Sequence, residues 1–206
     1  MKRLAAYEFA QRVDARIEAL PPEQFRERQR DAKRLLEELY PLSRLALSFK
    51  QPGLHVLVEA HEDSGRADGK IWLSGFLDKS FEVQVTFAGY GRPEALRASL
   101  LLRQGSGPGE PERKADETPA IGEPEDTDVS ISKLAASICE RGRSKVAKSY
   151  APGTVLLIAF EDVRLRGQSA WSRLYWAIEN AGRLEQGPFA RVYLFNSYSN
   201  ELQQVA

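Results

Sequence analysis

The chain has 206 residues and carries 29 basic and 29 acidic side chains, so it lacks the basic excess that marks many nucleic-acid binders. This length can bury roughly 70% of the unfolded surface in a core, and the single Cys139 excludes an internal disulfide and a cysteine-cluster zinc site. Because no window approaches about 18 uncharged apolar residues and residues 1–3 lead into a mixed-charge segment, we expect a soluble cytoplasmic protein without a membrane partner.

Helices are predicted before the first strand. Residues 4–20 have helical spacing, and Pro21 and Pro22 break this helix while allowing a second one to open, since proline is tolerated in a first turn. The second helix is expected to reach about Tyr40, where Pro41 should kink it or restart it into 42–49. We take 1–206 as a single domain in which 1–24 is an N-terminal helical extension.

Three strands are predicted in succession at 54–60, 70–76 and 80–87, and the short turn 77–79 favours an antiparallel meander. The two-residue period of the third strand divides its side chains between two faces. One face carries Phe81, Val83, Val85 and Phe87, and the other carries Glu82, Gln84 and Thr86.

The remaining elements predict the fold class. Residues 93–103 are predicted to form a short helix, and 104–128, rich in Gly, Pro and acidic residues, an exposed flexible loop. A helix at 130–150, a fully buried strand at 154–160, a helix at 169–181 and a strand at 190–196 follow. The order α-α-β-β-β-α-β-α-β predicts a three-layer α/β domain with a mixed sheet of about five strands flanked by helices.

Two acidic positions are the best candidates for chemistry. Asp68 precedes the second strand of the meander, and Glu82 shares a strand face with Gln84. If the two carboxylates meet, they can hold a hard divalent cation such as Mg²⁺. A hairpin turning tightly on 77–79 would place Asp68 well beyond Glu82, so the carboxylates would converge only if the second strand bends or bulges, which Gly69 and Gly75 permit.

This order of elements, with Asp68 before the second strand and Glu82-x-Gln84 on the third, resembles the PD-(D/E)xK nuclease superfamily over about residues 25–196. The resemblance implies a restriction-endonuclease-like core. It also implies that Asp68 and Glu82 hold Mg²⁺, for which Mn²⁺ can substitute, and that the partner is nucleic acid, with DNA the first choice.

The chain departs from the family's motif at two positions. Ala67 replaces the expected proline, and Gln84 replaces the expected lysine and would position water instead. The resemblance implies that a lysine on a helix, Lys145 or Lys148, can supply the missing charge. It also implies an acid on the first core helix, for which Glu37 and Glu38 both fit. Separately, Arg92 in a glycine-rich turn could contact a backbone phosphate.

Three functional hypotheses remain open. The first is a metal-dependent endonuclease or exonuclease with Asp68, Glu82, Gln84 and one of the two lysines in its site. The second is a catalytically inactive nuclease-fold module that binds nucleic acid or a protein partner. The third is an unrelated α/β protein, in which Asp68 is a turn former and Glu82 lies on a solvated sheet face. A homo-oligomer is possible under each hypothesis.

Overall fold

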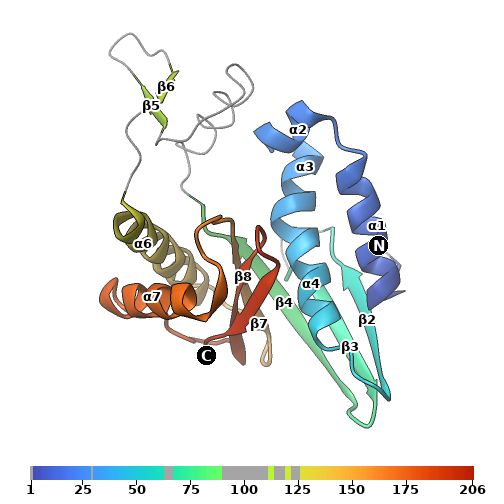
Figure 1. Ribbon diagram of the computed structural model, residues 1–206. Helices are drawn as coiled ribbons and strands as arrows, with labels where there is room; N and C mark the ends of the chain where they lie inside the picture. The colour runs from blue at the N-terminus through green and yellow to red at the C-terminus, as the bar shows by residue number, and fades with distance from the viewer. Residues whose placement is uncertain (1, 29, 63–66, 90–110, 114–118, 122–125) are drawn as a thin grey trace.

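A mixed seven-stranded β-sheet with helices on both faces is the framework of the protein (Figure 1). The computed structural model describes residues 2–28, 30–62, 67–89, 111–113, 119–121 and 126–206. The expected α/β class and the mixed sheet flanked by helices are confirmed, whereas the sheet has seven strands rather than about five. Within the described residues, no helix is long and apolar enough to cross a membrane.

The N-terminal region is mainly helical, but the second helix, expected to continue to about Tyr40, is interrupted after Glu27, where Arg28 is left-handed with φ +47°. The elements are β1 (Leu4–Ala5), α1 (Ala6–Glu18), α2 (Pro22–Glu27), α3 (Arg30–Arg34), the π-helical turn η1 (Leu35–Leu39) and α4 (Tyr40–Ser48). The irregularity expected at Pro41 takes the form of η1, in which the Tyr40 N–H donates to the Leu35 carbonyl five residues back. Pro41 has no N–H to continue a regular α-helical ladder, and the π turn directly before it changes the hydrogen-bond register.

The sheet combines an antiparallel half and a parallel half. Its strands are β1, β2 (Leu54–Ala60), β3 (Gly69–Gly75), β4 (Lys79–Phe87), β7 (Val155–Phe160), β8 (Arg191–Asn196) and β9 (Glu201–Gln204), in that spatial order. β4, β7 and β8 run parallel, and all other neighbours are antiparallel. β4 is therefore the junction, antiparallel to β3 and parallel to β7.

The five expected strands are all present, and two were missed. β1 and β9 lie at the two edges of the sheet and have two and four residues, too few for a visible alternating pattern. Part of the segment predicted as a loop is instead the small antiparallel pair β5 (Pro111–Arg113) and β6 (Pro119–Ile121). The helix predicted at 93–103 lies outside the described residues.

The register of the β3–β4 hairpin differs from the expected one. Lys70 lies opposite Glu82 and Leu73 opposite Lys79, so the hairpin pivots at Phe76 and not at 77–79. Gly75 allows the earlier turn because its φ is +133° and a Cβ there would collide with the carbonyl oxygen of Gly53. The ladder is regular from Gly69 onward, without the bend that would have let the Asp68 and Glu82 carboxylates converge in the expected register. Asp68 is instead hydrogen-bonded to Gln84 and Val85, while Glu82 lies beside Lys70 and His61.

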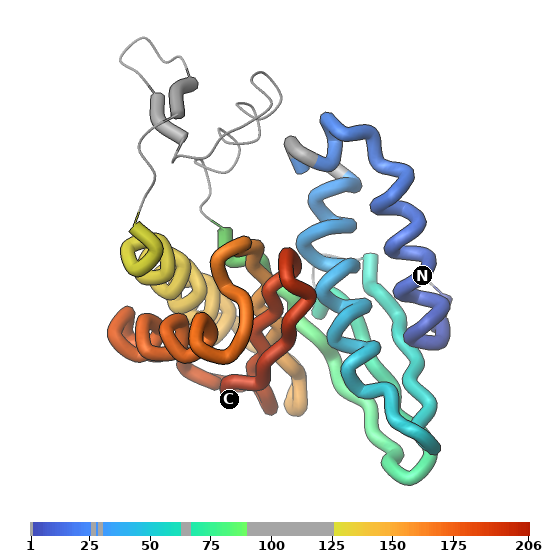
Figure 2. Tube along the Cα trace, in the orientation of Figure 1, coloured from blue at the N-terminus to red at the C-terminus, as the bar shows by residue number. Residues whose placement is uncertain are grey.

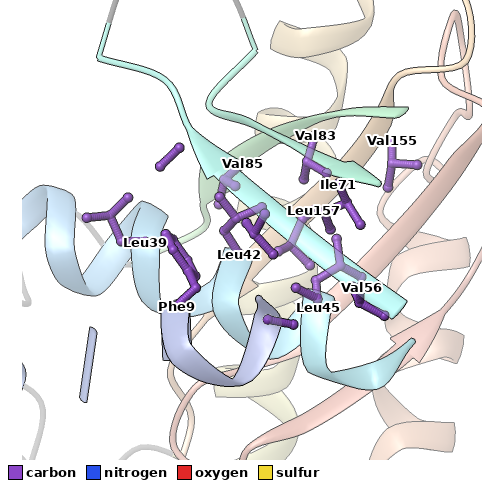
Figure 3. Packing of buried hydrophobic residues seen from close by; sticks show 14 of the residues in the cluster. Phe9, Leu39, Leu42, Leu45, Val56, Ile71, Val83, Val85, Val155 and Leu157 are labelled. Carbon is purple, nitrogen blue, oxygen red and sulfur yellow. The ribbon is translucent and has the colours of Figure 1, made fainter. Parts of the chain in front are cut away.

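Two apolar cores lie on opposite faces of the sheet. α1, η1 and α4 cover one face, and α6 (Thr127–Val146) and α7 (Gly167–Asn180) cover the other over β7 and β8. Figure 2 shows these blue and yellow-to-orange helix groups on opposite sides of the strands. Figure 3 shows the first core, in which helix residues Phe9, Leu42 and Leu45 lie against strand residues Val56, Ile71 and Val83.

β7 is buried on both faces, which confirms the interpretation of its continuous apolar run. All six of its residues are buried, and they alternate between the two cores. Residues 155, 157 and 159 join the first core, while 156, 158 and 160 join the second. The first residue of β7, Val155, pairs with Val83 of β4.

Candidate active site

The candidate site lies beside β4, at the level where both β3 and β7 begin. The β3–β4 ladder starts at Gly69 opposite Val83, so Asp68, one residue before it, reaches the level of Gln84. On the other side of β4, Gln84 pairs with Leu156 near the start of β7. The helix α6 connects β4 to β7 and therefore brings its last turn to this same level.

Asp68 bridges from the start of β3 to β4. Its Oδ2 accepts hydrogen bonds from the Val85 backbone N–H at 2.6 Å and from Gln84 Nε2. The Gln84 side chain is buried, and its Nε2 also donates to the Val85 carbonyl at 2.9 Å. Asp68 is therefore more than a turn former, because its carboxylate accepts the hydrogen bond of a backbone N–H in β4, that of Val85.

Burial raises the pKa of the Asp68 carboxyl above its ordinary value. The hydrogen bond from Val85 and the positive charges of Lys145 and Arg34 oppose this rise, yet burial outweighs them. A partly accessible carboxyl group whose pKa is raised by burial is typical of functional sites.

Glu38 is the second carboxylate at this site. Burial raises its pKa, and the negative charge of Asp68 raises it further. Its neighbour Glu37 instead lies 3.7 Å from Arg28, measured from Oε1 to Nη1. Of the two helix acids that the sequence left open, Glu38 is therefore the one that interacts with Asp68. Both residues belong to η1, and π-helical turns frequently occur at functional sites.

Lys145 contributes a positive charge from the last turn of α6. Its side chain is partly buried, which lowers its pKa, while the negative charges of Asp68 and Glu38 act in the opposite direction. Lys148 is exposed beyond the end of α6 and acts on Lys145 as a like charge. Lys145 is thus the predicted lysine that interacts with both carboxylates.

Glu82 lies on the same strand face as Gln84, and it pairs with Lys70, two pairs along the ladder from the level of Asp68. Its Oε1 is 3.5 Å from Lys70 Nζ, and its Oε2 is 3.7 Å from His61 Nδ1. Oε2 is buried and has no hydrogen-bond partner within the described part of the chain. A buried carboxylate oxygen without a donor is costly, and a cation would remove that cost.

Arg34 is a site residue that the sequence analysis missed. Its Nη2 donates to the His61 carbonyl at 2.5 Å, and its Nε is 3.6 Å from Glu38 Oε2. The available signal was the i,i+4 spacing from Glu38, which places two residues on one helix face. Predicted contact residue Arg92 lies outside the described residues.

The donor set suits a hard cation. Asp68 and Glu38 offer carboxylate oxygens, which Mg²⁺ and Mn²⁺ accept, whereas the basic neighbours of Glu82 are Lys70 and His61. Among the described residues, no three His, Cys, Asp or Glu side chains form a ready metal cluster. A Mg²⁺ ion would then keep several water ligands, as this ion commonly does with one or two protein carboxylates.

Comparison of the chain with protein-family models, with curated proteins and with solved structures found no match. The resemblance to PD-(D/E)xK nucleases therefore depends on the residues and the element order of this chain alone.

Proposed function

We propose that the protein is a Mg²⁺-dependent nuclease that hydrolyses a phosphodiester bond in nucleic acid, with DNA the first substrate to test. The observation that carries the proposal is the hydrogen bond from the motif residue Gln84 to Asp68, at a place where the charges of Asp68 and Lys145 both act on Glu38. Glu38 lies on η1, Lys145 on α6, and Asp68 directly before β3. Burial raises the pKa of both carboxyl groups and lowers that of the lysine, so it favours the neutral form of each. Carboxylates and a lysine whose pKa values are shifted by burial mark a candidate functional site.

The carboxylates would hold the ion in this proposal. Asp68 Oδ2 already accepts two hydrogen bonds, so Oδ1 is the oxygen left for a cation. Glu38 would supply a second oxygen, and the unpartnered Oε2 of Glu82 is available on the adjoining sheet face. When bound, Mg²⁺ would lower the pKa of a coordinated water and neutralise negative charge on the phosphate.

Lys145 and Gln84 would share the role of the family's motif lysine. Lys145 carries the positive charge that can stabilise the developing negative charge of the phosphorane. Gln84 cannot supply charge. Its Nε2 donates to Asp68 and to the Val85 carbonyl, so it would act as a positioning residue for Asp68 while its Oε1 accepts from water.

The alternative is a catalytically inactive nuclease-fold module that binds nucleic acid or a protein partner. One observation favours it: the amide of Gln84 occupies the motif position and is hydrogen-bonded to the first acid. A neutral amide in that place provides no transition-state charge, so activity in this chain depends on Lys145.

Cleavage of labelled DNA and RNA in the presence of Mg²⁺ or Mn²⁺ tests the proposal. We expect the wild-type protein to cleave and expect D68N, E38Q and K145M each to lose at least about 100-fold in rate. K148M and E140Q are matched controls, since both residues are exposed on or just beyond α6, and both variants should keep activity. A wild-type protein that binds nucleic acid but cleaves none with either ion would favour the inactive module.

A further inference from the structure

We propose that Arg34 is a substrate-binding residue that takes a phosphate of the nucleic acid when a divalent cation takes its present partner, Glu38. The inference deepens the proposed function and rests on it. It assigns a role to a residue outside the family's motif.

The contacts of Arg34 leave its guanidinium available. One end is fixed by the hydrogen bond from Nη2 to the His61 carbonyl, whereas the Nε to Glu38 Oε2 distance of 3.6 Å is too long for a good hydrogen bond. The side chains are 37% and 41% exposed, so an ion and a phosphate can reach both. Among the described residues, the only hydrogen bond that the Arg34 guanidinium donates is the one to His61, and an arginine fork matches the geometry of a phosphate.

Arg28, six residues before Arg34, already contacts other groups. Its Nη2 donates to Glu161, and its guanidinium lies over the Phe87 ring at 4.7 Å. Its Nη1 is buried, 3.7 Å from Glu37 and without a hydrogen-bond partner among the described residues, so a phosphate cannot reach it as it can the more exposed Arg34. Binding a phosphate at Arg28 would break an interaction between the N-terminal helices and the end of β7. Arg34 can change partners without disturbing such a contact.

The charges of the site also imply that binding of the ion favours binding of the phosphate. When ionised, Asp68 and Glu38 contribute two negative charges, and Arg34 and Lys145 both act on them with positive charge. The group is balanced before any ion binds. A divalent ion would leave an excess of positive charge that a phosphodiester, with one negative charge, would reduce.

Binding of the ion and of the phosphate should therefore be cooperative. Arg34 would weaken binding of the ion alone by competing for Glu38 and would strengthen it when a phosphate is present. By linkage, the ion must raise phosphate affinity by the same factor.

Titration with Mn²⁺, followed by the electron paramagnetic resonance of the free ion, tests this inference. Each protein is titrated alone and with excess dimethyl phosphate, a minimal phosphodiester that resists hydrolysis. We expect R34M to bind Mn²⁺ alone at least about threefold more tightly than wild type and to lose the increase in affinity caused by dimethyl phosphate. R34K, which keeps the charge, should bind Mn²⁺ alone as the wild type does.

R12M is the matched control. Arg12 forms an i,i+4 ion pair with Glu8 on α1, with the same spacing as Arg34 and Glu38 but with acid and base in the opposite order. R12M should behave like wild type in both titrations. If wild type binds Mn²⁺ and R34M matches R12M throughout, the inference on Arg34 is wrong while the metal site stands. If wild type binds no Mn²⁺ in either condition, the proposed function fails as well.

Discussion

At the scale of one residue, the carboxylate of Glu38 lowers the free energy of unfolding of the protein near neutral pH. Its carboxylate is partly buried beside the negative charge of Asp68, and both effects raise its pKa above 4.5. A carboxyl group with a higher pKa in the folded state than in the unfolded chain holds its proton more tightly when folded. Folding stability therefore falls as the pH rises above the unfolded value.

The variant E38Q removes this cost. Near pH 8 its free energy of unfolding should exceed that of wild type by up to about 1 kcal/mol, a modest gain because water screens a partly exposed group. Below about pH 4 the gain should vanish, since Glu38 is then protonated in both states. Urea denaturation at the two pH values measures the difference.

E8Q is the control for E38Q, because Glu8 is also paired i,i+4 with an arginine. It should not be stabilised at pH 8. An E38Q protein that is less stable than wild type at pH 8 would show that the Arg34 pair outweighs the repulsion from Asp68.

The β3–β4 hairpin, at the scale of an element, decides which residues meet. The sequence predicted both strands correctly but not their register, because Phe76 and Leu77 carry no turn signal as strong as that of Asp78. The deciding feature is a contact with another turn, Gly75 against Gly53, which a local pattern cannot reveal. The four-residue change in pairing brings Asp68 opposite Gln84.

Replacing Gly75 with alanine should therefore destabilise the β3–β4 turn that sets the position of Asp68 opposite Gln84. We expect G75A to lose about 2 kcal/mol or more of stability, since the residue has positive φ and no space for a Cβ. G153A is the matched control, with φ +83° and nothing within 4 Å of a Cβ, and should lose about 1 kcal/mol. Equal losses in thermal or urea unfolding would contradict this account of the turn.

At the scale of the whole molecule, the fold class was predictable and the assembly of the site only in part. Alternation and apolar runs gave the five main strands and the two-sided burial of β7. Asp68 was correctly singled out, but the sequence paired it with Glu82, whereas the register of the hairpin brings it to Gln84. The choice of Glu38 over Glu37 depends on the π turn, and the choice of Lys145 over Lys148 depends on where α6 ends, so neither follows from spacing alone.

The measurement that tests the central claim most directly is a crystal structure grown with Mn²⁺ and a short DNA strand, with Mn²⁺ located by its anomalous scattering. We predict one ion bound to Asp68 Oδ1 and to a Glu38 oxygen at roughly 2.2 Å, with Arg34 turned to a phosphate. A structure with DNA bound and no ion at Asp68, or with the ion held by other residues, would contradict the claim.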